Sequence, residues 1–408
     1  MGETAASSTS RFKRPLTKLA WSDTKLSSDD TRDASTLHHG TLKRLLVTGS
    51  VFSTQQFGGV SRYLVELARG VEASSDWNAR VAAPLYVNHY LREYRSTLHH
   101  RGVFFRHRKR GLSRLNDFIV KTLVPSSLNT ADVVHEGFFD ASTLRQARGA
   151  RIATVYDMIS ERFFPSESSL RKKQQTADAA DRLVAISEAT KNDVCHYLDV
   201  APEKVQVIHL AANMRPNTAK SKLVPDRPYF LWVGTREGYK NFGALIESLG
   251  RSKRFSSDFV LVCAGGPPLS QQEQQSWHDA GLDEHSVLHC RPQEHELASL
   301  YCHAESLVYV SQFEGFGIPP LEAMQCDCPV IASNCSSIPE VVGQAAELVN
   351  PDDTESIADA IDRMIEQPGL VEQLRDKGRL QASRFTWEKC VSQHLGLYQE
   401  ALQQRGGL

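Results

Sequence analysis

The sequence lacks several features that would assign it to a familiar class at once. No apolar run approaches the ~20 residues that a membrane-spanning helix requires, and none of its eight cysteines forms a Cys-x-x-Cys pair of the kind that binds zinc. The formal net charge is only −1, so the chain as a whole has no electrostatic drive toward nucleic acids or membranes. No Walker sequence is present, and no G-x-G-x-x-G follows the first expected strand. These absences argue against a membrane-spanning, zinc-binding or P-loop protein.

The chain also lacks the signs of a secreted protein. Its first residues, MGETAASSTSRFKRP, contain no apolar stretch of the kind found in signal peptides. All eight cysteines lie between residues 195 and 390, and we expect them to be reduced, as in a cytoplasmic protein. Cys326 and Cys328 flank Asp327 and offer a metal or redox pair as an alternative, although cysteines are more often simply buried. We expect a cytoplasmic location and no metal site.

What the sequence does contain is a repeated alternation of short apolar runs with helical segments. Residues 1–41 are rich in Ser, Thr and charged residues and are expected to form a disordered tail. Two series of apolar runs follow, separated by a polar, proline-containing segment. The runs span residues 45–49, 79–85, 131–137, 151–157, 182–188 and 204–210, and then 229–234, 259–266, 286–290, 306–311 and 329–333. This pattern is typical of parallel, doubly wound sheets, so we predict an α/β fold with two Rossmann-like domains.

The two series define the expected organisation of the chain. After the tail we expect an N-terminal domain at 42–212, a linker at 213–227, a C-terminal domain at 228–383 and a final helix at 384–408. Ligands of such sheets bind at the carboxyl ends of the strands, so the cleft between the domains is the expected site.

The strongest chemical signal is the segment SQFEGFGIPPLEAMQCDCPVIAS, residues 311–333. Glu314 and Glu322 stand eight residues apart, and the chain between them passes from an expected strand into a helix that begins at a proline pair. A carboxylate accepts hydrogen bonds and can bind a vicinal diol, and amides at a helix start can face an anion. The amides in that position are those of Gly315, Phe316, Gly317 and Ile318.

This segment, with several others, resembles the signature of the retaining glycosyltransferases of family four, which have the GT-B fold. The resemblance extends from residue 43 to residue 400, and within the family the chain resembles bacterial mannosyltransferases of surface-polysaccharide assembly. The other segments, in the order of the family, are FGGVSRYLVELARG (57–70), ADRLVAISEATKNDV (180–194), FLWVGTREGYKNF (230–242), ELASLYCHAESLVYVS (296–311) and RFTWEKC (384–390). The resemblance implies that the N-terminal domain binds the acceptor, that the C-terminal domain binds the nucleotide sugar, and that the final helix crosses back to the N-terminal domain.

The same resemblance implies roles for the two glutamates and for two cations. Glu314 would lie near the hydroxyls of the donor sugar, and Glu322 would accept hydrogen bonds from the ribose of the nucleotide. The amides of residues 315–318 would meet the diphosphate or the sugar. Arg236 and Lys240, in GTREGYKN, would neutralise the leaving diphosphate, because fixed cations stabilise charge that grows in the transition state.

In the N-terminal domain, Gly58 and Gly59 would close over the diphosphate, with a plain strand-to-helix turn as the alternative. His135, Tyr156 and Asp157 end two of the expected strands and are candidates for the acceptor side. Many relatives have His where this chain has Tyr156, and a lone histidine such as His135 often has only a structural role. Asp327 stands where relatives have glycine, which we expect to affect the geometry of the turn.

Residues 99–115, HHRGVFFRHRKRGLSRL, interleave aromatic and apolar residues with many basic ones. Such a segment is attracted to anionic membrane surfaces, which would give the protein a peripheral position at the inner face of the membrane. A solvated face and a site for an acidic acceptor are the alternatives. No RNA-binding motif is present, so we expect no nucleic-acid partner.

The predicted function is the transfer of a hexosyl unit from a nucleotide diphosphate sugar to a hydroxyl of a glycan or lipid-linked acceptor. The first guess for the donor is GDP-mannose. Retention at the anomeric carbon comes from the family resemblance, and no metal or other cofactor is expected because no D-x-D sequence stands near a strand end. A GT-B nucleotide-sugar epimerase and a non-catalytic nucleotide-sugar-binding protein are the alternatives.

Overall fold

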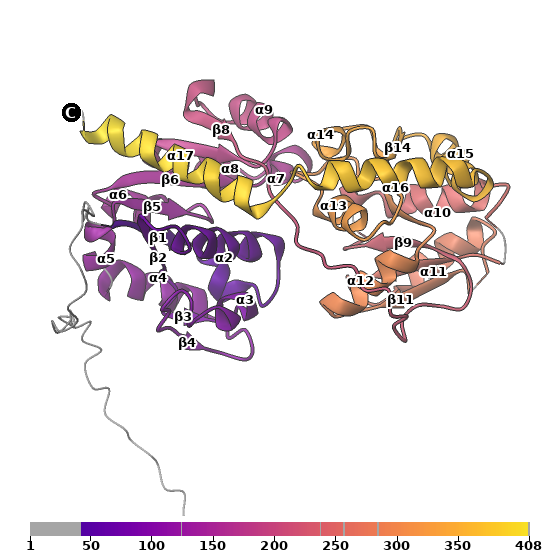
Figure 1. The fold of residues 1–408 in the computed structure, drawn as a ribbon, viewed down its shortest axis with the longest axis horizontal. Coiled ribbons are helices and arrows are strands. Elements are labelled where there is room, and N and C mark those ends of the chain that lie inside the picture. Colours follow the sequence, from indigo (N-terminus) through magenta and orange to yellow (C-terminus); the bar gives the residue numbers. More distant parts are fainter. Residues whose placement is uncertain (1–41, 124, 237, 256–257, 284, 407–408) are drawn as a thin grey trace, which may run out of the picture. The chain divides into compact units, whose positions relative to one another are not determined.

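The computed structural model describes residues 42–406 apart from 124, 237, 256–257 and 284. The tail expected at 1–41 lies outside the described residues. The described chain forms two six-stranded sheets and one two-stranded sheet (Figure 1). Neighbouring strands are parallel in each of them, so the predicted α/β class with two Rossmann-like domains is confirmed.

The N-terminal sheet has the strand order β2-β1-β5-β6-β7-β8. Its strands, in chain order, are β1 (Lys43–Thr48), β2 (Trp77–Val81), β5 (Val133–Glu136), β6 (Ala150–Val155), β7 (Arg182–Ala185) and β8 (Val205–Val207). The central strands β5 and β6 are buried on both faces along most of their length. Burial on both faces explains why the sequence shows continuous apolar runs rather than alternation.

The C-terminal sheet has the order β11-β10-β9-β12-β13-β14. Its strands are β9 (Tyr229–Val233), β10 (Val260–Ala264), β11 (Val287–Cys290), β12 (Ser306–Tyr309), β13 (Val330–Ser333) and β14 (Glu347–Val349). The central strands β9 and β12 are parallel neighbours. Their carboxyl ends therefore lie at one edge of the sheet, which brings together the loops that follow them.

Two details of the strand prediction were wrong. The run at 79–85 is not one strand, because β2 ends at Val81 and the separate strand β3 (Leu85–Tyr86) pairs with β4 (Val103–Phe104). Pro84 lies between them, and proline cannot donate to a strand ladder. The strand β14 was missed, since it has only three residues and is partly exposed at the sheet edge.

Helices connect the strands in both domains. In the N-terminal domain they are α1 (Val51–Thr54), α2 (Gly59–Glu72), α3 (His89–Glu93), α4 (Leu112–Leu123), α5 (Pro125–Thr130), α6 (Ala141–Gln146), α7 (Ile159–Phe163), α8 (Glu167–Ala179), α9 (Glu188–Tyr197) and the 3₁₀ turn η1 (Pro202–Lys204). The C-terminal domain has the 3₁₀ turn η2 (Gly238–Lys240) and α10 (Phe242–Arg251), α11 (Gln271–Asp279), α12 (Glu294–His303), α13 (Ile318–Gln325), α14 (Ile338–Val342), α15 (Thr354–Glu366) and α16 (Pro368–Ala382).

The last helix, α17 (Trp387–Gly406), packs against α2 and β6 of the N-terminal domain (Figure 1). The Tyr63 hydroxyl lies 2.7 Å from His394 Nε2, which joins α2 to α17. The amide of Lys389 donates to the Thr386 hydroxyl at 3.2 Å, so Thr386 caps the helix start. Residues 213–227 contain no helix or strand. The chain therefore passes between the domains twice, at this segment and before α17.

Candidate active site

Lys240 and Glu314 meet at the carboxyl edge of the C-terminal sheet. Lys240 ends η2, which follows β9, and Glu314 lies in the loop after β12. Lys240 Nζ lies 2.6 Å from Glu314 Oε1, and the side chains are 18% and 9% exposed. Parallel neighbouring strands explain how two residues far apart in sequence form one ion pair. A cation and an acceptor are thus fixed together at the edge where ligands of such sheets bind.

Glu322 lies on α13 with few partners for its carboxylate. The Tyr301 hydroxyl, on α12, donates to Oε2 at 3.2 Å, and Arg62 Nη1 lies 3.9 Å from Oε1. Burial raises the pKa of Glu322 to about 7, with the charge of Arg62 acting in the opposite direction. A carboxylate has about four acceptor positions, so this buried group retains capacity for further hydrogen bonds.

The glycines between the two glutamates are required by close contacts. Gly317 caps α13 with φ of 110°, a conformation that favours glycine. A Cβ atom on Gly315 would lie 2.1 Å from the carbonyl oxygen of Tyr156. The chain from Gly315 to Ile318 therefore lies against the N-terminal domain at the start of a helix, where amides favour an anion.

Other candidates of the N-terminal domain also reach this loop. A Cβ atom on Gly59 would lie 3.4 Å from Ile318 Cδ1, so the Gly58-Gly59 turn lies against the start of α13. Asp157 Cβ would lie 3.1 Å from a Cβ on Gly315. Burial raises the pKa of Asp157, Lys173 lowers it, and the nearby Glu314 charge raises it further. The structure thus brings Gly59 and Asp157 to the Glu314 loop.

The structure does not bring the His135 and Tyr156 side chains to this site. His135 is fully buried, with Nδ1 at 2.6 Å from the Tyr398 hydroxyl and Nε2 at 2.7 Å from the Thr154 hydroxyl. Tyr156 packs edge-on against Tyr63 with its ring in the core, and within the described residues its hydroxyl has no hydrogen-bond partner. Both side chains point into the N-terminal domain, because they face α2 and α17 rather than the loop edge.

The Arg236 side chain also forms its contacts away from Glu314. Its Nε donates to Glu273 at 2.6 Å and its Nη2 donates to the Pro267 carbonyl at 2.6 Å. The side chain is only 1% exposed. The guanidinium therefore links α11 to the loop after β10 in the described structure, whereas Lys240 is the cation beside Glu314.

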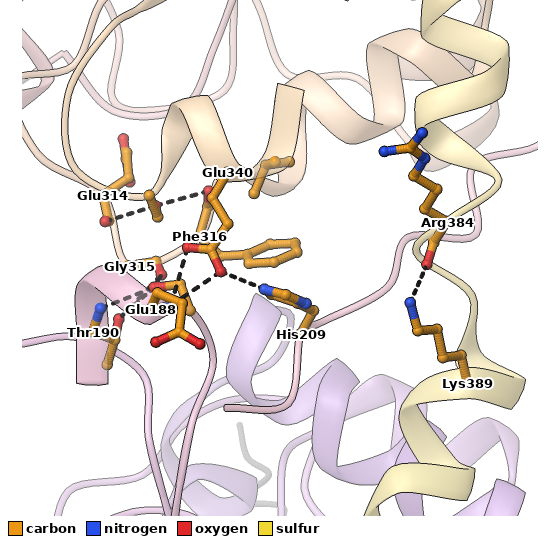
Figure 2. Close-up of polar contacts among 12 residues, drawn as sticks. Glu188, Thr190, His209, Glu314, Gly315, Phe316, Glu340, Arg384 and Lys389 are labelled. Carbon is orange, nitrogen blue, oxygen red and sulfur yellow. Dashed lines mark hydrogen bonds and ion pairs between the residues drawn. The ribbon is translucent and has the colours of Figure 1, made fainter. Parts of the chain in front are cut away.

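Sequence reasoning missed four residues that surround the same loop. The Ser187 hydroxyl contacts the Gly315 carbonyl. Figure 2 shows the Thr190 hydroxyl at the same carbonyl and Glu340 beside His209. Ser187 caps α9 and follows β7 closely. That position was a usable signal, because residues after parallel strands gather at one edge of the sheet. His209 follows β8 as closely as Ser187 follows β7, so the same signal was available for it. Its pairing with Glu340 carried no such signal, since it depends on how the domains contact each other.

Two further expectations concern Asp327 and the possibility of a metal. Asp327 has φ of 57° and pairs with Arg379 at 2.8 Å, so it does affect the turn, as predicted. Cys326 and Cys328 are both buried. Across the described residues, no group of three or more His, Cys, Asp or Glu could hold a metal ion. Among the same residues, no helix combines the length and the apolar character of a membrane span.

Comparison with known protein families assigns the chain to a family of enzymes. A sequence model described as Glycosyltransferase Family 4 matches residues 57–214, and one described as Glycosyl transferases group 1 matches residues 214–381. The chain belongs to the family 4 glycosyltransferases. Sucrose-phosphate synthase from Thermosynechococcus elongatus has a similar structure, with a TM-score of 0.70 at 19% identity, covering 89% of this chain and 100% of that one. The GT-B fold is thereby confirmed.

Curated relatives of this glycosyltransferase include enzymes of O-antigen synthesis. O-antigen chain mannosyltransferase B of Escherichia coli is 28% identical over 241 residues, which cover 55% of this chain and 62% of the relative. O-antigen chain mannosyltransferase RfbU of Salmonella typhimurium is 34% identical over 193 residues, which cover 46% of this chain and 52% of the relative. The matched part thus spans between about half and two thirds of these relatives.

Proposed function

We propose that the protein transfers a mannosyl unit from GDP-mannose to a hydroxyl of a glycan or lipid-linked acceptor, with retention at the anomeric carbon. The observation that carries the proposal is Glu322, a buried carboxylate with a raised pKa and unused acceptor positions. A ribose diol would supply the missing donors and favour the ionised form. The names of the matched mannosyltransferases support the choice of sugar.

The remaining roles follow from the position of each group. Lys240, beside Glu314, would stabilise charge on the leaving diphosphate, and this fixed cation supports transfer without a metal. Glu314 would contact hydroxyls of the donor sugar, and the amides of residues 315–318 would face its phosphates. Asp157 lies on the N-terminal side of the loop, where it would orient the acceptor hydroxyl.

The test is calorimetry with GDP and UDP, followed by transfer assays with GDP-mannose and an acceptor panel in the presence of EDTA. We expect tighter binding of GDP, an α-linked product by NMR, and activity that EDTA does not remove. Tighter binding of UDP would reject the donor, and a β-linked product would reject retention. Conversion of the donor sugar without an acceptor would instead indicate an epimerase, and binding without any turnover would indicate a non-catalytic protein.

We also propose that residues 99–115 contact an anionic membrane surface. Residues 106–110 are all exposed, and Lys109 Nζ lies 5.5 Å from the Phe105 ring. Leu115 and Phe118, on α4, are 51% and 62% exposed. Sedimentation with anionic and neutral vesicles tests this proposal. Equal binding to both would show that the basic residues do not recruit the protein.

A further inference from the structure

The N-terminal domain contacts the loop of the candidate site through two hydroxyls. The Ser187 hydroxyl lies 2.7 Å from the Gly315 carbonyl oxygen. The Thr190 hydroxyl, which Figure 2 shows beside Gly315, lies 3.1 Å from the same atom. Both residues are almost completely buried. Two buried donors on one carbonyl fix the orientation of the peptide between Gly315 and Phe316.

A second contact joins the domains beside the first. Glu340, on α14, accepts from the amide of Glu188 at 3.0 Å and contacts His209 Nε2. The Ser337 hydroxyl, which precedes α14, lies 2.9 Å from the carbonyl oxygens of Glu314 and Phe316. The same loop is therefore contacted from the C-terminal domain as well.

We infer that Ser187 and Thr190 are positioning residues, which set the backbone of the Glu314–Gly317 loop for sugar transfer. The peptide group is planar, so fixing the Gly315 carbonyl toward the N-terminal domain turns the Phe316 amide the opposite way. This inference rests on the proposed function of the loop. A productive loop geometry would then depend on contact between the domains, and the same contact would exclude water from the site.

Thr190→Val tests the inference with little change in shape. We expect kcat for sugar transfer to fall by about 3- to 10-fold, because the hydrogen bond from the Thr190 hydroxyl to the Gly315 carbonyl is lost. The donor KM should change less, because Glu322 and Lys240 remain. Thr190→Ser keeps the hydroxyl and should restore kcat. The matched control is Thr176→Val, because the Thr176 hydroxyl is also buried but donates within its own helix.

Amide hydrogen exchange gives a readout that does not need activity. Exchange at Phe316 and Gly317 should be faster in Thr190→Val than in Thr176→Val. If the wild-type protein transfers no sugar, the proposed function fails, whatever the variants do. If the wild type is active and Thr190→Val matches the Thr176→Val control in both kcat and exchange, the positioning role is refuted.

Discussion

Replacement of Glu322 gives the most direct test of the proposed nucleotide site. Its carboxylate accepts one hydroxyl, from Tyr301, and lies 3.9 Å from Arg62. A ribose diol would add charge-assisted hydrogen bonds, each contributing roughly 1.5–3 kcal/mol. We therefore expect Glu322→Ala to weaken binding of the nucleoside diphosphate by about 10- to 150-fold, measured by calorimetry. Glu294→Gln is the control, because Glu294 is an exposed carboxylate that also pairs with Arg62. This variant removes a negative charge near Arg62 but leaves Glu322 in place. Unchanged affinity of Glu322→Ala would refute the ribose contact.

The raised pKa of Glu322 makes both the stability of the protein and its binding of the diphosphate depend on pH. Its folded pKa of about 7 exceeds the ordinary value of 4.5, so the stability that it contributes is present below pH 4.5 and is lost as the pH rises through 7. We expect Glu322→Gln to raise the free energy of unfolding at pH above 7, and to leave it nearly unchanged below 4.5. Binding of the nucleoside diphosphate should strengthen as the pH rises through 7, because Glu322 then ionises and accepts hydrogen bonds from the ribose. Titration of the ligand's own phosphates affects both proteins, so the increase should be larger in the wild type than in Glu322→Gln.

Three other variants test separate parts of the site. Lys240→Ala should lower kcat and kcat/KM equally, because its charge acts mainly as the diphosphate leaves; a rise in KM alone would assign it to ground-state binding. Tyr156→Phe should leave transfer nearly unchanged, since the hydroxyl lies in the core; a large loss of kcat would show that the hydroxyl contacts substrate. Truncation before Phe385 should abolish transfer and lower the thermal stability of the N-terminal domain, because α17 covers Tyr63 and His135; normal transfer by the truncated protein would refute this role.

The sequence alone determined the class of fold and the passage from a strand into a helix that begins between Glu314 and Glu322. Apolar runs buried on both faces are long and continuous, so they remain visible without any knowledge of their neighbours. Glycine, proline and carboxylate at fixed spacing have local consequences, and the cap of α13 at Gly317 follows from them.

Tertiary structure alone decided which candidate side chains face the loop. His135 and Tyr156 stand at strand ends, but the direction of a side chain at a strand end depends on which face the helices α2 and α17 cover. Arg236 and Lys240 are both cations of one short sequence segment, yet Arg236 pairs with Glu273 and Lys240 pairs with Glu314. Ser187, Thr190, His209 and Glu340 gain their roles only from contact between the domains. Such contacts join residues more than 100 positions apart, so a local pattern can place a residue at the sheet edge but cannot name its partner in the other domain.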